Sequence, residues 1–285
     1  MCGNSLFDFE YSIINSSVQG ASHKKSKLPN QDSYKIVEIP NAVIIAVADG
    51  HGNKTCLHSK KGSAMADRVF CSMMSDLLSN YADDMDALKL LLSEEGNKFI
   101  SDQIEKEWKR RIIRSYRRLK NTDVQPRLTI EEKKSIWQQY GTTLLGLVMT
   151  PTFVFAYQLG DGDIVLSEDS VSKRIIESDG LLGTDTFSLS GINAWKYSKS
   201  TVIPIPEIKD SCSIMLSTDG FSNSYSNDEV FFETAHDYHL AIKKYGADTI
   251  QNNLSAWLKE TSSGGSGDDI TVVIVYTRKK VSSPA

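Results

Sequence analysis

Short apolar runs and longer stretches with helical spacing divide the first half of the chain. The run 42–48 (AVIIAVA) predicts a buried strand, because seven consecutive apolar residues stand between turn-forming positions. Residues 59–79 carry apolar side chains three to four positions apart, which predicts a helix with one buried face. A similar pattern covers 84–120, as one helix or two. Its apolar stripe consists of Leu88, Leu91, Leu92, Phe99, Ile104, Trp108 and Ile112.

Strand-like runs dominate the second half. Thr129 and Glu132 have the spacing of a capping box, which predicts that a short helix begins there. Strands are predicted at 142–150, 152–160, 163–168, 172–178, 200–206, 212–218 and 269–277, and helices at 228–246 and 248–262. Grouped strands and grouped helices favour an α+β fold over alternating βαβ units. We expect one domain over residues 1–285, with a core of about 10–278.

Composition excludes several classes of protein. The formal net charge of −4 gives no general attraction to nucleic acid or to an anionic membrane. No apolar run reaches the length of a membrane span, and the first residues do not resemble a secretory signal. Four scattered cysteines without a CxxC pair are typical of free thiols in a reducing compartment. We therefore expect a cytoplasmic monomer that binds neither nucleic acid nor membrane.

Carboxylates stand where predicted strands meet glycine-rich turns. Asp49 follows the run 42–48, Asp161 and Asp219 follow two later strands, and Asp268 and Asp269 precede the last one. Any one of these motifs alone is more typical of ordinary turn chemistry than of a ligand. If the strand ends share one edge, however, several negative charges converge, and such charges repel one another unless cations neutralise them.

The kind of ligand indicates the kind of cation. Oxygen ligands without a cysteine or multi-histidine set favour Mg²⁺ or Mn²⁺ over structural zinc. Two such ions about 3.5–4 Å apart can share a water molecule and lower its pKa. That arrangement suits the hydrolysis of a phosphate ester.

Six short motifs resemble those of the metal-dependent serine/threonine protein phosphatases of the protein phosphatase 2C type, also called the PPM family. They are KLPNQD (27–32), VADGHG (47–52), GTT (141–143), QLGDGD (158–163), STDGFS (217–222) and GDDIT (267–271). They occur in the family's order, and their short form looks more bacterial than animal. The resemblance implies a four-layer αββα sandwich, with two central antiparallel sheets between layers of helices.

The resemblance also implies roles for individual residues. Asp49 would bridge two metal ions, and the carbonyl oxygen of Gly50 would bind one of them. Asp219 and Asp268 would complete the other site, and Asp161 matches a position tied to a third, weaker ion. Asp32 would orient a metal-bound water. The hydroxide between the metals would attack phosphorus directly, and His51 would protonate the leaving oxygen.

Three positions depart from the family pattern. Lys27 stands where the family usually has an arginine that clamps phosphate, so it would act as a point charge without bidentate geometry. Gln31 replaces a frequent glutamate, and Asn223 replaces an aspartate that often supports the third ion. Asp163 is an additional acid without an assigned role.

The main prediction is thus a Mn²⁺- or Mg²⁺-dependent phosphatase for phosphorylated proteins, with a serine/threonine kinase as a further expected partner. The alternatives are a phosphatase-like binding module without turnover and a hydrolase for small phosphorylated metabolites. The basic run 106–120 either contacts an acidic partner or RNA, or forms the solvated face of a helix whose Trp108, Ile112 and Tyr116 point inward.

Overall fold

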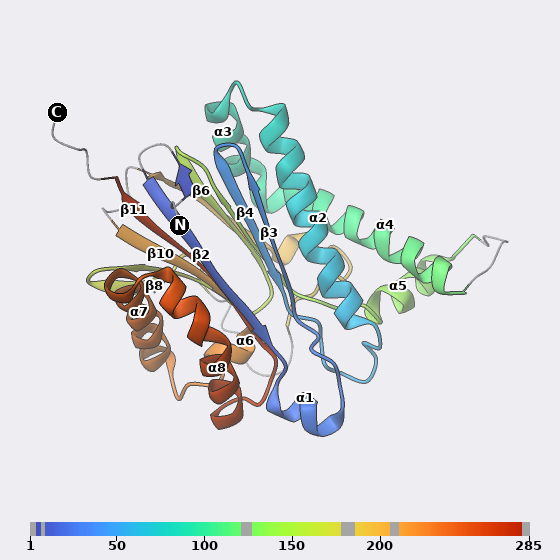
Figure 1. The fold of residues 1–285 in the computed structure, drawn as a ribbon. Coiled ribbons are helices and arrows are strands. Elements are labelled where there is room, and N and C mark those ends of the chain that lie inside the picture. The colour runs from blue at the N-terminus through green and yellow to red at the C-terminus, as the bar shows by residue number, and fades with distance from the viewer. Residues whose placement is uncertain (1–3, 7–8, 121–126, 178–185, 206–210, 281–285) are drawn as a thin grey trace.

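Two antiparallel sheets stacked face to face form the centre of the protein (Figure 1). The computed structural model describes residues 4–6, 9–120, 127–177, 186–205 and 211–280. One sheet has the order β1 (Asn4–Leu6), β2 (Phe9–Val18), β11 (Ile270–Lys279), β10 (Ser211–Ser217), β7 (Asp163–Glu168) and β8 (Val171–Arg174). The other has the order β3 (Ser33–Ile39), β4 (Ala42–Ala48), β5 (Leu144–Met149), β6 (Phe153–Leu159) and β9 (Lys199–Pro204).

Helices cover both outer faces of this pair of sheets (Figure 1). The β3–β9 sheet is covered by α2 (Ser59–Asn80), α3 (Met85–Glu95), α4 (Ser101–Lys120) and α5 (Ile130–Gln138). The β1–β8 sheet is covered by α7 (Asp228–Tyr245) and α8 (Ala247–Gly264). Two short helices, α1 (Ala21–Ser26) and α6 (Asp219–Ser222), lie at one end of the sheets. The predicted four-layer αββα sandwich is confirmed.

The strand β4 shows why an unbroken apolar run was required. Ile44, Ala46 and Ala48 pack under α2, whereas Val43, Ile45 and Val47 pack against the other sheet. Successive side chains of a strand point to opposite faces, so a strand between two apolar layers has no solvent-facing position. All seven residues of β4 are accordingly buried.

The segment 84–120 consists of two α-helices joined by a π-helical turn at Gly96–Ile100. The turn shifts the helical register, so Ile100 is buried and Phe99 is 54% exposed. The prediction that Phe99 belongs to the apolar stripe was therefore wrong. Trp108 and Ile112 are fully buried and Tyr116 packs against the same cluster, so the inward face of the basic run is confirmed.

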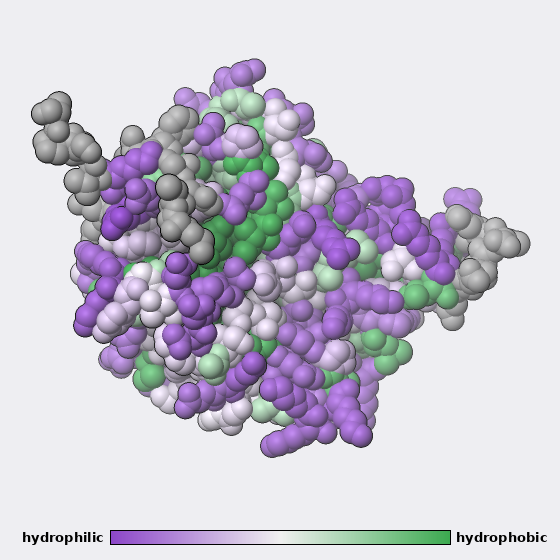
Figure 2. Space-filling model, in the orientation of Figure 1, coloured by the Kyte–Doolittle hydropathy of each residue, from purple (hydrophilic) through white to green (hydrophobic). Residues whose placement is uncertain are grey.

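The strands β1, β2 and β3 and the helix α1 were not predicted from the sequence. The capping box at Thr129 and Glu132 is present at the start of α5, and Gly246 ends α7 as expected. Within the described ranges, no helix is long and apolar enough to cross a membrane. Hydrophilic residues cover most of the face in Figure 2, and one hydrophobic band crosses it near β3 and β4.

Asp163, which had no assigned role, belongs to a structural ion pair. Its carboxylate lies 2.6 Å from Nε of Arg174, and the same guanidinium contacts both carboxylate oxygens of Asp228 at 2.5 and 3.0 Å. Burial raises the pKa of Asp163, and Arg174 opposes that shift. The pair joins β7 and β8 to the beginning of α7.

We predict that Arg174→Met lowers the free energy of unfolding by about 3 kcal/mol, because it leaves Asp163 buried without a cation. Urea denaturation at pH 7 measures the change. The matched control is Arg278→Met, whose partner is Glu10 at 3.0 Å and whose side chain is 62% exposed. That variant should lose less than about 1 kcal/mol. Equal losses in the two variants would contradict the structural role.

Candidate metal centre

The register of the strands brings the predicted acidic residues to one end of the sandwich. In one sheet Ser33 pairs with Ala48, so Asp32 precedes β3 beside the point where Asp49 follows β4. In the other sheet Ser217 pairs with Val272, so Asp219 lies beside the loop that carries Asp268. Residues that are far apart in the sequence therefore share one edge.

These carboxyl groups are close enough to change one another's charge. The pKa of Asp49 is raised well above its usual value by burial, and the charges of Asp32, Asp219 and Asp268 raise it further. Burial also raises the pKa of Asp219 to about 6, with contributions from Asp161 and Asp268. All five predicted aspartates thus act electrostatically on the same small region.

Backbone hydrogen bonds fix the position of Asp49. Its N–H donates to Oγ1 of Thr143 at 3.0 Å, and its carbonyl oxygen accepts from Oγ1 of Thr142 at 2.6 Å and from the Thr143 N–H at 2.9 Å. The GTT motif therefore holds the VADGHG motif in place. A Cβ at Gly50 would lie 2.6 Å from the carbonyl oxygen of Gln31, so only glycine fits there.

Two carboxylates at this edge each have one satisfied and one unsatisfied oxygen. Oδ2 of Asp32 accepts from Oγ1 of Thr218 at 2.8 Å, and Oδ2 of Asp219 accepts from Nδ2 of Asn223 at 3.0 Å. Oδ1 of each is buried and has no hydrogen-bond partner within the described part of the chain. A buried carboxylate oxygen is costly to leave unpaired. The donor set therefore fits divalent cations and their bound water.

His51 and Asp161 flank this group. The N–H of His51 donates to the carbonyl oxygen of Gly141 at 3.1 Å. Burial lowers the pKa of His51, and the charge of Asp161 acts in the opposite direction. Asp161 is exposed and accepts a hydrogen bond from Thr186. Both residues are thus near the carboxylates, as the sequence predicted.

Lys27 is not joined to this group by an ion pair within the described ranges. It ends α1 with a left-handed backbone conformation, φ 59°, and its side chain is exposed. Asn223 gives its amide to Asp219 and supplies no carboxylate for a third ion. The two departures from the family pattern therefore differ: one places an exposed cation at the end of α1, and the other positions a predicted ligand.

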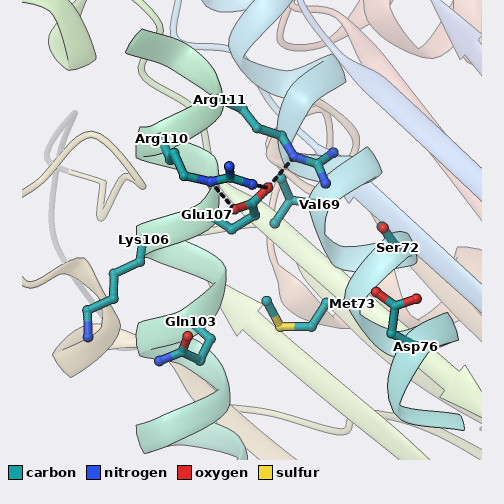
Figure 3. Close-up of a pocket in the computed structure, with 9 residues that line it drawn as sticks. All are labelled: Val69, Ser72, Met73, Asp76, Gln103, Lys106, Glu107, Arg110 and Arg111. Carbon is teal, nitrogen blue, oxygen red and sulfur yellow. Dashed lines mark hydrogen bonds and ion pairs between the residues drawn. The ribbon is translucent and has the colours of Figure 1, made fainter. Parts of the chain in front are cut away.

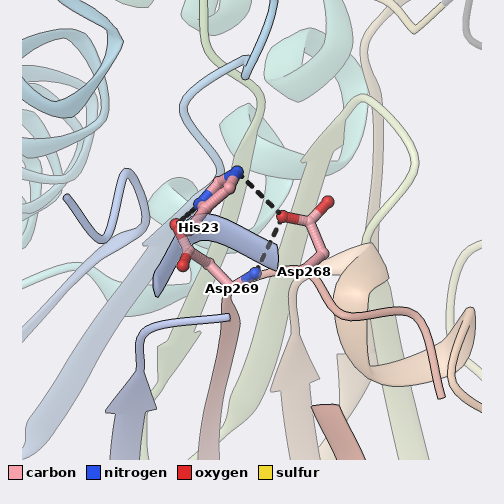
Figure 4. Close-up of side chains that lie close together, drawn as sticks. All are labelled: His23, Asp268 and Asp269. Atoms are coloured by element: carbon pink, nitrogen blue, oxygen red, sulfur yellow. Dashed lines mark hydrogen bonds and ion pairs between the residues drawn. The ribbon is translucent and has the colours of Figure 1, made fainter. Parts of the chain in front are cut away.

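Two further residues belong to this edge, His23 and Asp269. The sequence placed Asp269 at a strand end without assigning it a role, and it gave no signal for His23. Asp269 is buried and accepts hydrogen bonds from the N–H groups of Gly20 and Gln31, both at 2.7 Å. Nδ1 of His23 lies 2.8 Å from Oδ2 of Asp269 (Figure 4). Basic residues around His23 were visible in the sequence, but its contact with Asp269 depends on strand pairing between the two ends of the chain.

A pocket of about 550 Å³ lies between α2 and α4 (Figure 3). Arg110 and Arg111 on its rim both contact Glu107 at 2.6 Å. Their charges are therefore partly neutralised within the helix. Binding of an acidic partner to the basic run 106–120 stays a prediction.

The sequence and the fold both resemble those of known proteins. A family model for protein phosphatase 2C matches residues 19–259. The chain belongs to the protein phosphatase 2C family. Membership supports a metal-dependent activity toward phosphorylated proteins, in agreement with the prediction from the six motifs.

Solved protein phosphatase 2C structures share the fold at low sequence identity. The catalytic domain of the serine/threonine phosphatase PstP in complex with two manganese ions is 15% identical, with a TM-score of 0.54 over 95% of this chain and 99% of that one. The serine/threonine phosphatase of S. agalactiae is 17% identical, with a TM-score of 0.55 over 93% and 99%. RsbX in complex with magnesium is 15% identical, with a TM-score of 0.52 over 96% and 98%. No curated protein sequence matches the chain.

Because the pKa of Asp219 is raised, we predict that the folding stability of this protein phosphatase 2C depends on pH when no metal is bound. The folded-state pKa of about 6 exceeds the ordinary 3.8, so the folded protein binds the proton more tightly than the unfolded chain. Stability should therefore fall as the pH rises from about 4 to about 6. The variant Asp219→Asn lacks this titrating group. Its free energy of unfolding should therefore increase, relative to that of the wild type, by roughly 2 kcal/mol over that interval.

Thermal and urea unfolding in EDTA between pH 4 and pH 7 measures the difference. Asp237→Asn, on the exposed part of α7, is the matched control. A difference between wild type and Asp219→Asn that stays constant with pH would contradict the electrostatic account of this edge.

Proposed function

We propose that the chain hydrolyses phosphoserine and phosphothreonine in proteins at a pair of Mn²⁺ or Mg²⁺ ions. The observation that carries this proposal is the meeting of Asp49, Asp219 and Asp268 at one edge of the two sheets, with the unpartnered oxygens of Asp32 and Asp219 beside them. Family membership supports the reaction, and the manganese and magnesium in related structures support the choice of ions.

The resemblance assigns Asp49 to both ions, the Gly50 carbonyl oxygen to one of them, and Asp219 and Asp268 to the other. Asp161 would contribute to a third, weaker site. When bound, such ions lower the pKa of a water molecule and withdraw charge from phosphate oxygens. The mutual repulsion of these carboxylates is the physical reason that the fold would favour bound cations.

The chain's own residues supply the remaining chemistry. Oδ1 of Asp32 has a free lone pair with which to accept a hydrogen bond from water and to orient it. Neutral His51 cannot give a proton away, but its protonated form is a stronger acid because burial lowers its pKa. As the resemblance implies, this form of His51 would protonate the departing serine or threonine oxygen. Lys27 would contact the phosphate as a point charge.

Positive charge on the two stretches of chain next to Asp32 and Asp49 supports an anionic substrate. The stretches 11–31 and 50–66 contain no aspartate or glutamate. Six lysines in these two stretches are exposed: Lys24, Lys25, Lys27, Lys54, Lys60 and Lys61. The stretches are joined by a hydrogen bond of 2.6 Å from Nε2 of Gln31 to Oγ of Ser59. These two lysine-containing stretches would attract a phosphorylated segment before it reaches the metal centre.

We further infer that the chain acts as a cytoplasmic monomer and forms one catalytic domain with a core of about 10–278. A serine/threonine kinase would produce its substrate. Three cysteines in the described part, Cys56, Cys71 and Cys212, are buried free thiols, which agrees with a reducing compartment. A binding module without turnover is not favoured by the family membership.

The first test of the proposal is the variant Asp49→Asn. Hydrolysis of a phosphothreonine peptide in Mn²⁺ should fall by about 10³-fold or more, because the variant weakens the ligand shared by both ions. Asp237→Asn is the control and should retain activity. A wild-type protein that binds Mn²⁺ without hydrolysing peptides would favour the binding module. Turnover of small phosphorylated metabolites, but not of peptides, would favour the metabolite hydrolase.

A second test separates proton donation from metal binding. In His51→Gln the rate with a phosphothreonine peptide should fall by about 10²-fold or more, because an alkoxide is a poor leaving group. The rate with para-nitrophenyl phosphate should fall by less than about tenfold, since nitrophenolate leaves without a proton. Steady-state assays with both substrates measure the ratio, and His58→Gln is the control. Equal losses with both substrates would assign His51 another role.

A further inference from the structure

His23 lies against the acidic residues that precede the last strand (Figure 4). Its ring contacts Asp268 and Asp269, and one ligand atom from each of the three residues lies within 4.8 Å of the others. His23 comes from α1 and the two aspartates come from the loop before β11. The N–H of Ser22 joins the two segments by donating to the carbonyl oxygen of Gly267 at 2.8 Å.

The contact with Asp269 fixes the orientation of the His23 ring. Nδ1 of His23 is buried and lies 2.8 Å from Oδ2 of Asp269, in a close contact that is not a linear hydrogen bond. Asp269 is itself held by two backbone N–H groups, those of Gly20 and Gln31. The ring therefore turns Nδ1 toward Asp269 and Nε2 toward Asp268.

The other ring nitrogen faces Asp268. Nε2 of His23 lies 3.6 Å from Oδ1 of Asp268, which is too long for a direct hydrogen bond. An imidazole nitrogen and a carboxylate oxygen are both metal-ligand atoms. Ligand atoms bonded to one divalent ion at about 2.1 Å each lie up to about 4 Å apart, so the observed separation fits a shared cation.

Buried oxygens beside this pair independently indicate a ligand. Asp32 and Gln31 are each 8% exposed, and Oδ1 of Asp32 and Oε1 of Gln31 have no hydrogen-bond partner within the described residues. A Cβ at Gly52 would stand 3.5 Å from Oε1 of Gln31 and 3.6 Å from Nε2 of His23, so these two atoms border the same space. Burial raises the pKa of Asp32, and the charges of Asp269 and Asp268 raise it further, so these carboxyl groups lie near one another.

We infer that Nε2 of His23 is a nitrogen ligand to the ion that Asp268 holds, and that it makes this centre prefer a first-row transition ion over Mg²⁺. The inference rests on the metal centre of the proposed function, because Asp268 is a ligand only there, but it does not require that phosphate esters be hydrolysed. Mg²⁺ takes oxygen ligands and keeps its water, whereas the affinity of a site with a nitrogen ligand for divalent ions rises along the first-row transition series that begins with Mn²⁺. Asp269 then orients the ring through Nδ1, as carboxylates orient many metal-binding histidines.

Electron spin-echo spectroscopy of the Mn²⁺-loaded protein tests this directly. The wild type should show modulation from a directly bound ¹⁴N nucleus, which changes to ¹⁵N modulation when histidine is labelled. His23→Gln should lose the signal, and the control His236→Gln should keep it. Isothermal titration should show Mn²⁺ affinity lowered by about 10- to 100-fold in His23→Gln, with Mg²⁺ affinity changed by less than about threefold.

Each result decides between a ligand and a merely structural histidine. Absence of a nitrogen signal in the wild type, its persistence in His23→Gln, or equal losses for both metals would overturn the inference. Thermal unfolding in EDTA checks that His23→Gln is folded. If peptides are hydrolysed but no nitrogen signal is seen, only this inference fails. If the nitrogen signal is present but no phosphate is released, the proposed function fails and the ligand assignment stands.

Discussion

Repulsion between carboxylates is the constraint on which the rest of the structure depends. Burial raises the pKa values of Asp32, Asp49 and Asp219, and the charges of neighbouring aspartates, Asp268 among them, raise these values further. Such a group stays together only if the backbone around it is held from several sides. The two sheets, their outer helices and the threonines at the strand ends provide that support, and bound cations would relieve the remaining strain.

The supporting contacts come mainly from backbone and hydroxyl groups. Thr142 and Thr143 hold the backbone of Asp49, and Thr218 bonds both to Asp32 and, through its Oγ1, to the N–H of Thr271. One hydroxyl thus joins the two sheets at the point where the acids meet. Short side chains with one rotatable hydroxyl fix geometry at low entropic cost. The centre is therefore positioned by residues that carry no charge.

Strong local patterns predicted the α+β fold class and the acidic edge, whereas the four layers were implied by the family resemblance. β4 is entirely apolar, and Asp49, Asp219 and Asp268 stand at or near the ends of apolar runs. β2 and β3 were missed because Ser16, Ser17, Lys35 and other polar residues interrupt their apolar alternation. Phe99 was misplaced because a π-turn shifts the register of its helix. The contacts of His23 could not be predicted from the sequence, because Asp268 and Asp269 lie in the loop before β11, at the other end of the chain.

The pairing of β2 with β11 places residues 9–18 beside residues 270–279 in one sheet. Contacts of such long sequence separation form slowly, because a large loop must close before they contribute. During translation, α1 and Gln31 leave the ribosome long before Asp268 and Asp269 exist to meet them. A growing chain therefore cannot assemble the acidic edge, which is complete only after β11 has entered the sheet between β2 and β10.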